Sequence, residues 1–150
     1  MRLRSFLSVG AVVMMISCGG KAPAPDTSAD KALGAALHDY VVEFLRRNPT
    51  TNTYLGGAGL DPTLHEVDGT LRNHSMAAIS AEDQWLTNTK RTLEAMPDAS
   101  LSPNAKIDRD VALAQIAFLL RQHQTRRYQE RALDTYVGEP FRAIDWQLQG

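Results

Sequence analysis

A histidine followed by a glutamate is the pair in this sequence that comes nearest to a catalytic motif. His65 and Glu66 begin like the helical zinc-binding motif in which two histidines four residues apart bind the metal and the glutamate acts as base. Position 69 is Gly69, so the second histidine is missing. The surrounding proline and glycine residues predict a loop. We therefore expect His65 to be a loop histidine without a catalytic role.

The other residues of chemical interest lack a partner at a useful spacing. His38, His74 and His123 stand singly, and we expect hydrogen-bonded histidines at the surface or partly buried. Asp108 and Asp110 are two residues apart and point to different sides of a helix, so they cannot share a substrate. The sequence predicts no catalytic, cofactor-binding or metal-binding residue.

Two further runs have simple structural interpretations. The run Gly56-Gly57-Ala58-Gly59 is not followed by the lysine and serine or threonine of a phosphate-binding loop, so it predicts a backbone turn. Arg121, Arg126, Arg127 and Arg131 form a basic run, which suggests nucleic acid in a cytoplasmic protein. Outside the cytoplasm we expect a solvated face or carboxylate pairing instead, and no nucleic-acid partner.

Helical spacing dominates the rest of the chain. Apolar residues from about Ala29 to Arg47 recur on one helix face. The stretch from Asn48 to Gly69 is rich in Pro, Gly, Asn and Thr and has no period, so it predicts an ordered loop about twenty residues long. A second helix is predicted from about Thr70 to Met96, with an alternative start at Ser80 to Asp83 that would divide it.

A third helix is predicted to begin at an N-cap, Ser102, followed by Pro103, and to end near Arg127. Its apolar stripe is wide enough for burial between two neighbours. The tail from Tyr128 to Gly150 is less regular, because glycine and proline interrupt it. The main face of the third helix is predicted to be Ile107, Val111, Ala114 and Phe118, widened by Leu113, Ala117 and Leu120.

The N-terminal residues predict an export signal that ends at the only cysteine. Arg2 and Arg4 precede an apolar run from Phe6 to Ile16, which is too short to span a bilayer. With Ser17 before Cys18, the segment resembles the lipobox of bacterial lipoproteins, which implies that Cys18 carries lipid in the mature protein. The alternative is an ordinary signal peptide with an incidental cysteine, but an unpaired thiol would then remain.

The lipobox resemblance implies a membrane-tethered protein. Gly19 stands where an inner-membrane retention signal has aspartate, which favours the outer membrane. Small residues and proline from Gly19 to Asp30 predict a flexible tether. Removal of residues 1–17 takes away two arginines and leaves 14 basic against 17 acidic residues, a charge of −3 that implies no strong electrostatic partner.

The predicted fold class is therefore all-α: an antiparallel bundle of about three long helices with one long ordered loop, after a signal peptide and flexible tether. The predicted divisions are a lipoprotein signal peptide over residues 1–17, the lipidated cysteine and tether over residues 18–30, and a helical region over residues 31–150.

The order of these features resembles the N-terminal region of the bacterial domain-of-unknown-function family numbered 885. The resemblance covers about Ala32 to Gly150 and rests on Pro49, Thr53 and Gly56, with Asp108 near the start of the third helix. It implies a longer α-helical protein similar to zinc carboxypeptidases, whose His-Glu-x-x-His helix lies downstream and is absent here.

Two functions are compatible with this resemblance. The chain is expected to be a lipid-anchored, non-catalytic N-terminal portion of a metallopeptidase-like protein, truncated before its metal-binding helix, with the missing part as a partner. Zinc is then a cofactor only of a full-length homologue. The alternative is a self-sufficient helical lipoprotein that acts as an envelope binding or interaction module.

Overall fold

Helices form almost the whole of the part of the chain that the structure describes. The computed structural model describes residues 27–149, which contain no strand, so the all-α prediction is confirmed. The predicted signal peptide, Cys18 and most of the tether lie outside the described residues. The last three predicted tether residues, 28–30, form the first turn of a helix.

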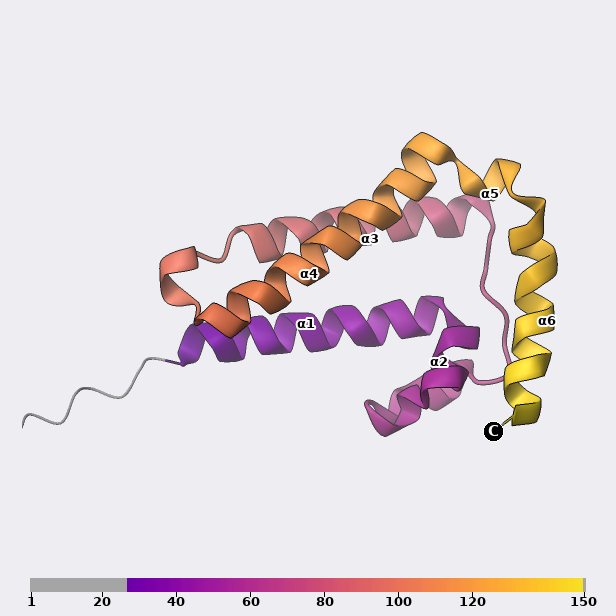
Figure 1. Ribbon diagram of the computed structural model, residues 1–150, viewed down its shortest axis with the longest axis horizontal. Coiled ribbons are helices and arrows are strands. Elements are labelled where there is room, and N and C mark those ends of the chain that lie inside the picture. Colours follow the sequence, from indigo (N-terminus) through magenta and orange to yellow (C-terminus); the bar gives the residue numbers. More distant parts are fainter. Residues whose placement is uncertain (1–26, 150) are drawn as a thin grey trace, which may run out of the picture.

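Three long helices, α1 (Ser28–Arg47), α3 (Met76–Glu94) and α4 (Pro103–Leu120), pack on one another. Helix α3 runs opposite to α1 and α4 (Figure 1). A short 3-10 helix, η3 (Asp98–Ser100), joins α3 to α4. The three helices close around one apolar core, whose buried members are Leu33, Tyr40, Leu86, Leu93, Leu101, Ala105, Ala112 and Ile116.

Serine caps start both α3 and α4. The side chain of Ser102 accepts a hydrogen bond from Ala105 N, and Pro103 occupies the first helical position, as predicted. Helix α3 begins later than predicted, because Ser75 caps it by accepting from Ala78 N. The helix continues without a break through Ser80, so the alternative start there is wrong.

The predicted twenty-residue loop is wrong, because most of it is helical. It contains α2 (Pro49–Leu55) and two 3-10 helices, η1 (Gly57–Gly59) and η2 (Pro62–Val67). A turn at residues 68–69 then leads into an extended segment at residues 70–75. Helix α2 spans only seven residues, which is too short for a period to show. Its limits were nevertheless visible in the sequence, since proline begins it and Gly56 ends it with a φ of 64°.

The predicted buried face of α4 is also wrong. Ile107, Val111 and Phe118 are exposed, whereas the side toward the core carries Ala105, Arg109, Ala112 and Ile116. Apolar residues surround α4 on nearly every side, so the period could not choose between faces. The sequence pattern did not predict a buried arginine. Arg109 donates to Met96 O at 2.9 Å and pairs with Asp98 at 2.6 Å and Asp110 at 3.4 Å.

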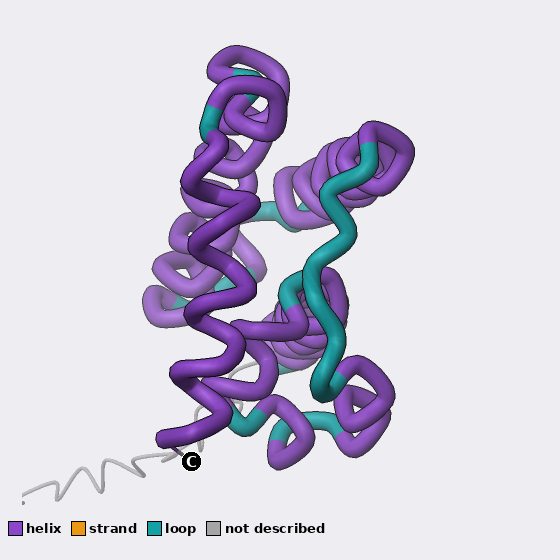
Figure 2. The backbone as a smooth tube through the Cα atoms, turned by 90° about the vertical axis from the view of Figure 1, so that its right-hand side faces the viewer, coloured by secondary structure: helices purple, strands orange, loops and turns teal. Residues whose placement is uncertain are grey.

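The irregular tail predicted after Arg127 is helical as well. A π-helical turn, η4 (Arg121–Arg126), follows α4, and α5 (Tyr128–Arg131) and α6 (Leu133–Gln149) complete the described chain. Helix α6 contains Pro140, which costs about 3 kcal/mol in a helix interior. Its packing against α2 and α5 outweighs that cost. Figure 2 shows α6 standing across the ends of the long helices.

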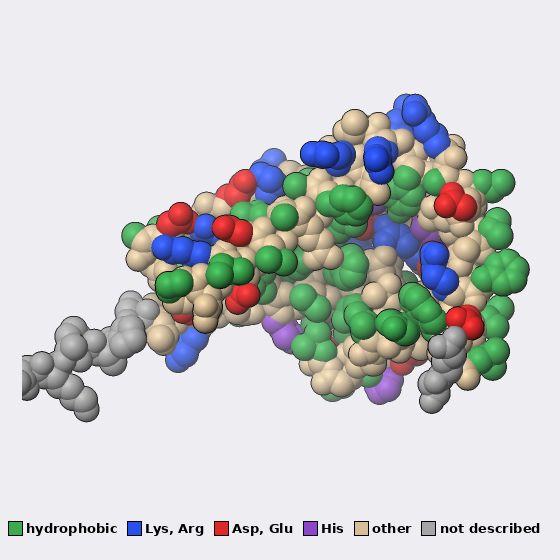
Figure 3. Space-filling model, viewed as in Figure 1, with side chains coloured by type: hydrophobic (Ala, Val, Ile, Leu, Met, Phe, Trp, Pro, Cys, Tyr) green, Lys and Arg blue, Asp and Glu red, His purple; other side chains and the backbone are tan. Residues whose placement is uncertain are grey.

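The outer side of α6 carries a continuous apolar stripe. Its members are spaced by four, four, three and four residues, which places them on one helix face. In Figure 3 they project from the right-hand edge of the molecule. They are Leu133, Val137, Phe141, Ile144 and Leu148, each more than half exposed.

Candidate functional site

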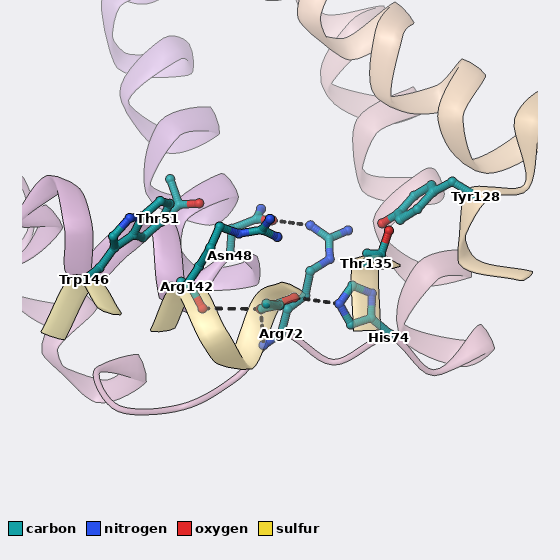
Figure 4. Close-up of a pocket in the computed structure, with 10 residues that line it drawn as sticks. Asn48, Thr51, Arg72, His74, Tyr128, Thr135, Arg142 and Trp146 are labelled. Carbon is teal, nitrogen blue, oxygen red and sulfur yellow. Dashed lines mark hydrogen bonds and ion pairs between the residues drawn. The ribbon is translucent and has the colours of Figure 1, made fainter. Parts of the chain in front are cut away.

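A pocket of about 190 Å³ lies where α2, the extended segment, α5 and α6 meet. It combines charged and polar side chains from distant parts of the described chain (Figure 4). Its wall contains two arginines, one carboxylate, one imidazole, several hydroxyls and one indole. The lining residues are Asn48, Thr50, Thr51, Arg72, His74, Tyr128, Thr135, Glu139, Arg142 and Trp146.

Local backbone geometry explains how these side chains meet. Arg72 and His74 are two apart on an extended segment, so their side chains leave the same side. Leu71 and Asn73, which alternate with them, are exposed. Pro49 starts a new helix directly after α1, and this brings the following two threonines to the pocket.

The Arg72 guanidinium is held by two partners behind the pocket. Its Nη2 donates to Glu82 Oε2 at 2.7 Å, and its Nη1 donates to Asn48 Oδ1. The side chains of Arg72 and Glu82 are 10% and 4% exposed. A charge pair this deeply buried is costly to form and more costly to break. Arg72 Nε is buried without a hydrogen-bond partner among the described residues.

Glu139 of α6 joins the extended segment to α2. Its Oε2 accepts from His74 Nε2 at 2.7 Å, and its Oε1 accepts from the backbone N–H of Arg72 at 2.9 Å. The Thr50 hydroxyl donates to the same Oε1 at 3.4 Å. Both carboxylate oxygens are therefore engaged inside the protein, and the carboxylate fixes the imidazole that it accepts from.

This His74–Glu139 pair resembles the base and its orienting carboxylate in hydrolases, but within residues 27–149 no nucleophilic side chain is hydrogen-bonded to His74. The other ring nitrogen, His74 Nδ1, is buried and has no hydrogen-bond partner within residues 27–149. In a nucleophilic site that nitrogen would face a serine, threonine or cysteine. The geometry is therefore that of a structural clamp and a binding wall.

Tyr128 closes the pocket with a neutral phenol. Burial raises its pKa, so the hydroxyl keeps its proton at neutral pH. The ring stacks on His123, with centroids 5.4 Å apart. On the far wall, the Trp146 indole lies 4.4 Å from the Tyr54 ring, measured between centroids. The pocket thus has an aromatic group at each end and polar groups between them.

His123 links the π-helical turn that follows α4 to helix α3. It is buried in the π-helical turn, and its Nδ1 lies 2.7 Å from Asp83 Oδ1 of α3. Gln124 donates to the other oxygen of Asp83 at 3.2 Å. This contact holds the end of α4 on α3 and sets the position from which α5 begins.

The predicted single histidines are thus partly confirmed as hydrogen-bonded groups. His74, His123 and the exposed His65 each have a carboxylate partner, which for His65 is Asp68 at 3.0 Å. His38 is exposed and lies 3.6 Å from Asp39. The structure does not bring these four histidines together, and no cluster of metal-binding side chains occurs within residues 27–149.

The residues behind the family resemblance have structural roles in α2. Pro49 begins that helix, Gly56 ends it, and the Thr53 hydroxyl donates to Asp68 at 3.3 Å. Asp108 is exposed on α4, away from the pocket lining. The four arginines of the basic run are exposed, as expected for a solvated face, and Arg127 pairs locally with Glu130 at 2.6 Å.

Sequence reasoning missed the charged residues of the pocket. Arg72 lies on the extended segment, Glu82 lies on α3 behind the pocket, and Glu139 and Arg142 lie three residues apart on α6. Only the last two share a spacing in the sequence. The available signal was the alternation of Arg72 and His74 in a short stretch, which fits an extended segment with one polar side. The sequence pattern instead predicts that Thr70 to Ser75 belong to the second helix.

Known proteins offer no guide to this site, since no family model, curated protein or solved structure matches the chain. No helix in the described range is long and apolar enough to cross a membrane.

Proposed function

We propose that this protein is held at the outer membrane of a bacterial envelope by lipid on Cys18. We also propose that residues 27–149 are the non-catalytic N-terminal part of a longer metallopeptidase-like protein, in line with the resemblance to family 885. The observation that carries the second proposal is the apolar surface on α6 and α4.

The α6 stripe has the pattern of a helix that is packed on both sides. Leu133, Phe141 and Leu148 are 75%, 71% and 82% exposed, although α2 covers the opposite side of the same helix. Monomeric proteins seldom leave such a continuous apolar stripe in water. Additional chain packed along α6 would remove this surface from solvent, at roughly 25 cal/mol for each Å² buried.

The outer face of α4 supports the same proposal. Ile107, Val111 and Phe118 are 61%, 63% and 56% exposed and lie on one side of the helix. The sequence predicted burial between two neighbours for this helix, and within the described residues only one side is covered. A larger helical domain would supply the second neighbour.

The lipid anchor is supported by sequence and by where α1 starts. Cys18 follows an export signal, and α1 begins at Ser28. Nine residues, from Gly19 to Thr27, then separate the two. A fully extended chain of that length reaches about 30 Å, so a lipid on Cys18 would keep the helices close to the membrane surface.

Metabolic labelling with a palmitate analogue tests the anchor. The wild-type protein should take up label and partition into the detergent phase, and Cys18→Ser should do neither. Ser17→Ala keeps a small residue before the cysteine and is the matched control, so it should still be labelled. Labelling of the Cys18→Ser variant would refute lipid attachment at this residue.

Zinc analysis tests the non-catalytic proposal. The piece from Cys18 to Gly150, purified alone, should contain no stoichiometric zinc and should hydrolyse no peptide in a chelator-sensitive way. Either finding would contradict the proposal and would favour an enzyme complete in these residues.

A second candidate function is a self-sufficient envelope binding module. The closed core of α1, α3 and α4 and the polar pocket favour it. A single cooperative thermal transition of the mature chain would support this function, whereas a broad transition with aggregation would support a part of a longer domain.

A further inference from the structure

One arginine of the pocket has no partner, whereas the other charged side chains are engaged. Arg72 is compensated by Glu82, and Glu139 is engaged by His74, Thr50 and the Arg72 backbone. Arg142 also lines the pocket; it is exposed and forms no ion pair or side-chain hydrogen bond within the described residues. The pocket wall therefore holds one guanidinium whose donors are free.

Other free donors line the same pocket. The hydroxyls of Thr51, Thr135 and Tyr128 take part in no side-chain hydrogen bond within residues 27–149. The phenol stays protonated at neutral pH, because burial raises the pKa of Tyr128. The lining thus offers a cation and several O–H groups, while its carboxylate is already satisfied.

The positions of the two arginines favour a ligand between the pocket walls. Figure 4 shows the side chains of Arg142 and Arg72 reaching toward Asn48 from opposite sides. Asn48 and Glu82 fix Arg72, whereas the Arg142 guanidinium lies over Gly138, which has no side chain to hold it. Arg142 is therefore free to turn its fork toward an incoming group.

The volume of the pocket limits the ligand. A space of about 190 Å³ equals roughly six water molecules at about 30 Å³ each. This is enough for inorganic phosphate or for a short carboxylic acid. The Trp146 and Tyr128 rings leave room for an apolar portion beside the charged group.

We propose that this pocket binds a small oxyanion, the carboxylate or phosphate group of a ligand, with Arg142 as its principal charged contact. A guanidinium fork matches both groups in a bidentate way. The threonine and tyrosine hydroxyls donate to the remaining oxygens. This binding activity is independent of the lipid anchor and of any further chain packed on α6.

The test uses the mature chain, purified from membranes in detergent. Thermal unfolding and tryptophan fluorescence are followed while millimolar sodium phosphate or sodium acetate replaces chloride at constant ionic strength. We expect saturable stabilisation and a saturable change in emission. Trp146→Phe should lose the emission change but keep the stabilisation, because the other indole, Trp85, lies on α3 outside the pocket lining.

Matched arginine variants separate the pocket from general charge. Arg142→Gln should raise the apparent Kd at least tenfold, and Arg142→Lys should weaken binding less, since it keeps the charge without the fork. Arg121→Gln removes an equal charge from the exposed π-helical turn and should bind as the wild type does. A response to phosphate alone would identify the bound group as a phosphate, and a response to acetate alone would identify it as a carboxylate.

Three outcomes would overturn the proposal. They are no saturable response to either anion, an unchanged Kd in Arg142→Gln, and an equal loss of binding in Arg121→Gln and Arg142→Gln. None of them bears on lipidation or zinc content, so this proposal and the proposed function fail separately.

Discussion

At the scale of single residues, the pocket depends on a buried charge pair. Replacement of Glu82 by alanine would leave the Arg72 guanidinium buried without its counter-charge, and we expect a loss of about 3–5 kcal/mol in the free energy of unfolding. Urea denaturation measures this loss.

The matched control is Glu43→Ala, because Glu43 is 31% exposed and pairs with Arg47 on the same helix. That change should cost less than about 1 kcal/mol. Equal losses in the two variants would contradict the buried role of Glu82.

Gly57 lies so close to the Asn52 side chain that a larger residue does not fit there without strain. A Cβ built at this position lies 2.0 Å from Oδ1 of Asn52, which is fully buried. Asn52 also donates to Leu64 O at 3.1 Å and to Asp68 at 3.0 Å, so its amide cannot turn away. Gly57→Ala should therefore destabilise the protein by about 1–3 kcal/mol.

Gly59 provides the control for this substitution. A Cβ there meets nothing within 4 Å and the φ is not positive, so Gly59→Ala should be neutral or slightly stabilising. Thermal unfolding of the two variants compares them directly. If Gly57→Ala is as stable as Gly59→Ala, the described position of Asn52 is wrong.

The sequence predicted the character of individual residues better than their partners. His74 was predicted to be a hydrogen-bonded histidine, and it is. Its partner, Glu139, is 65 residues away, and no local pattern reports a contact over that distance. The same limit hid the pairing of Arg72 with Glu82, since the two lie on different elements.

At the scale of elements, one serine starts α4. Ser102→Ala removes the acceptor of the Ala105 N–H and should cost about 1 kcal/mol, measured by urea denaturation. Ser80→Ala is the matched control, because Ser80 lies exposed in the interior of α3 and caps nothing. It should be neutral or slightly stabilising. A larger loss from Ser80→Ala than from Ser102→Ala would instead indicate that Ser80 is itself the N-cap of a helix.

The junction of α1 and α4 predicts a dependence of stability on pH. Asp30 accepts from the backbone N–H of Ser102 at 3.0 Å, and this bond holds the pKa of Asp30 below its usual range. Its contribution to stability is present above the unfolded pKa of about 3.9 and is lost as the pH falls through the lower folded pKa. The free-energy difference between wild type and Asp30→Asn should therefore be constant near neutral pH and shrink below about pH 4.

Urea unfolding at a series of pH values measures this difference. Asp108→Asn, at an exposed position of α4, is the control for removal of a carboxylate. A difference that grows as the pH falls would contradict the hydrogen bond between Asp30 and Ser102.

Element prediction succeeded where a period or a cap was present. Helix α1 was predicted within one residue of its start, and the cap of α4 was identified correctly. It failed for α2, which is too short to show a period, and for α6, where Pro140 stands inside the helix. Tertiary packing makes both segments helical, because α2 and α6 pack on each other.

At the scale of the whole molecule, the exposed stripe of α6 should behave differently from the core. In the piece from Cys18 to Gly150 produced alone, Phe141→Ser and Leu148→Ser should leave the free energy of unfolding nearly unchanged and reduce binding of an apolar dye. Ile116→Ala removes a fully buried side chain and should cost about 2–5 kcal/mol. Denaturation and dye fluorescence check both expectations. A large loss of stability from Phe141→Ser would show that this face is already covered.

The central claim is that lipid-anchored helices form the start of a longer protein, which covers the stripe of α6. The most direct measurement is the intact mass of the polypeptide that carries Cys18, captured from native envelopes with an antibody to an exposed segment. We expect lipid on Cys18 and a polypeptide longer than the 133 residues from Cys18 to Gly150. A mass equal to those residues, with or without lipid, would contradict the claim of a longer protein.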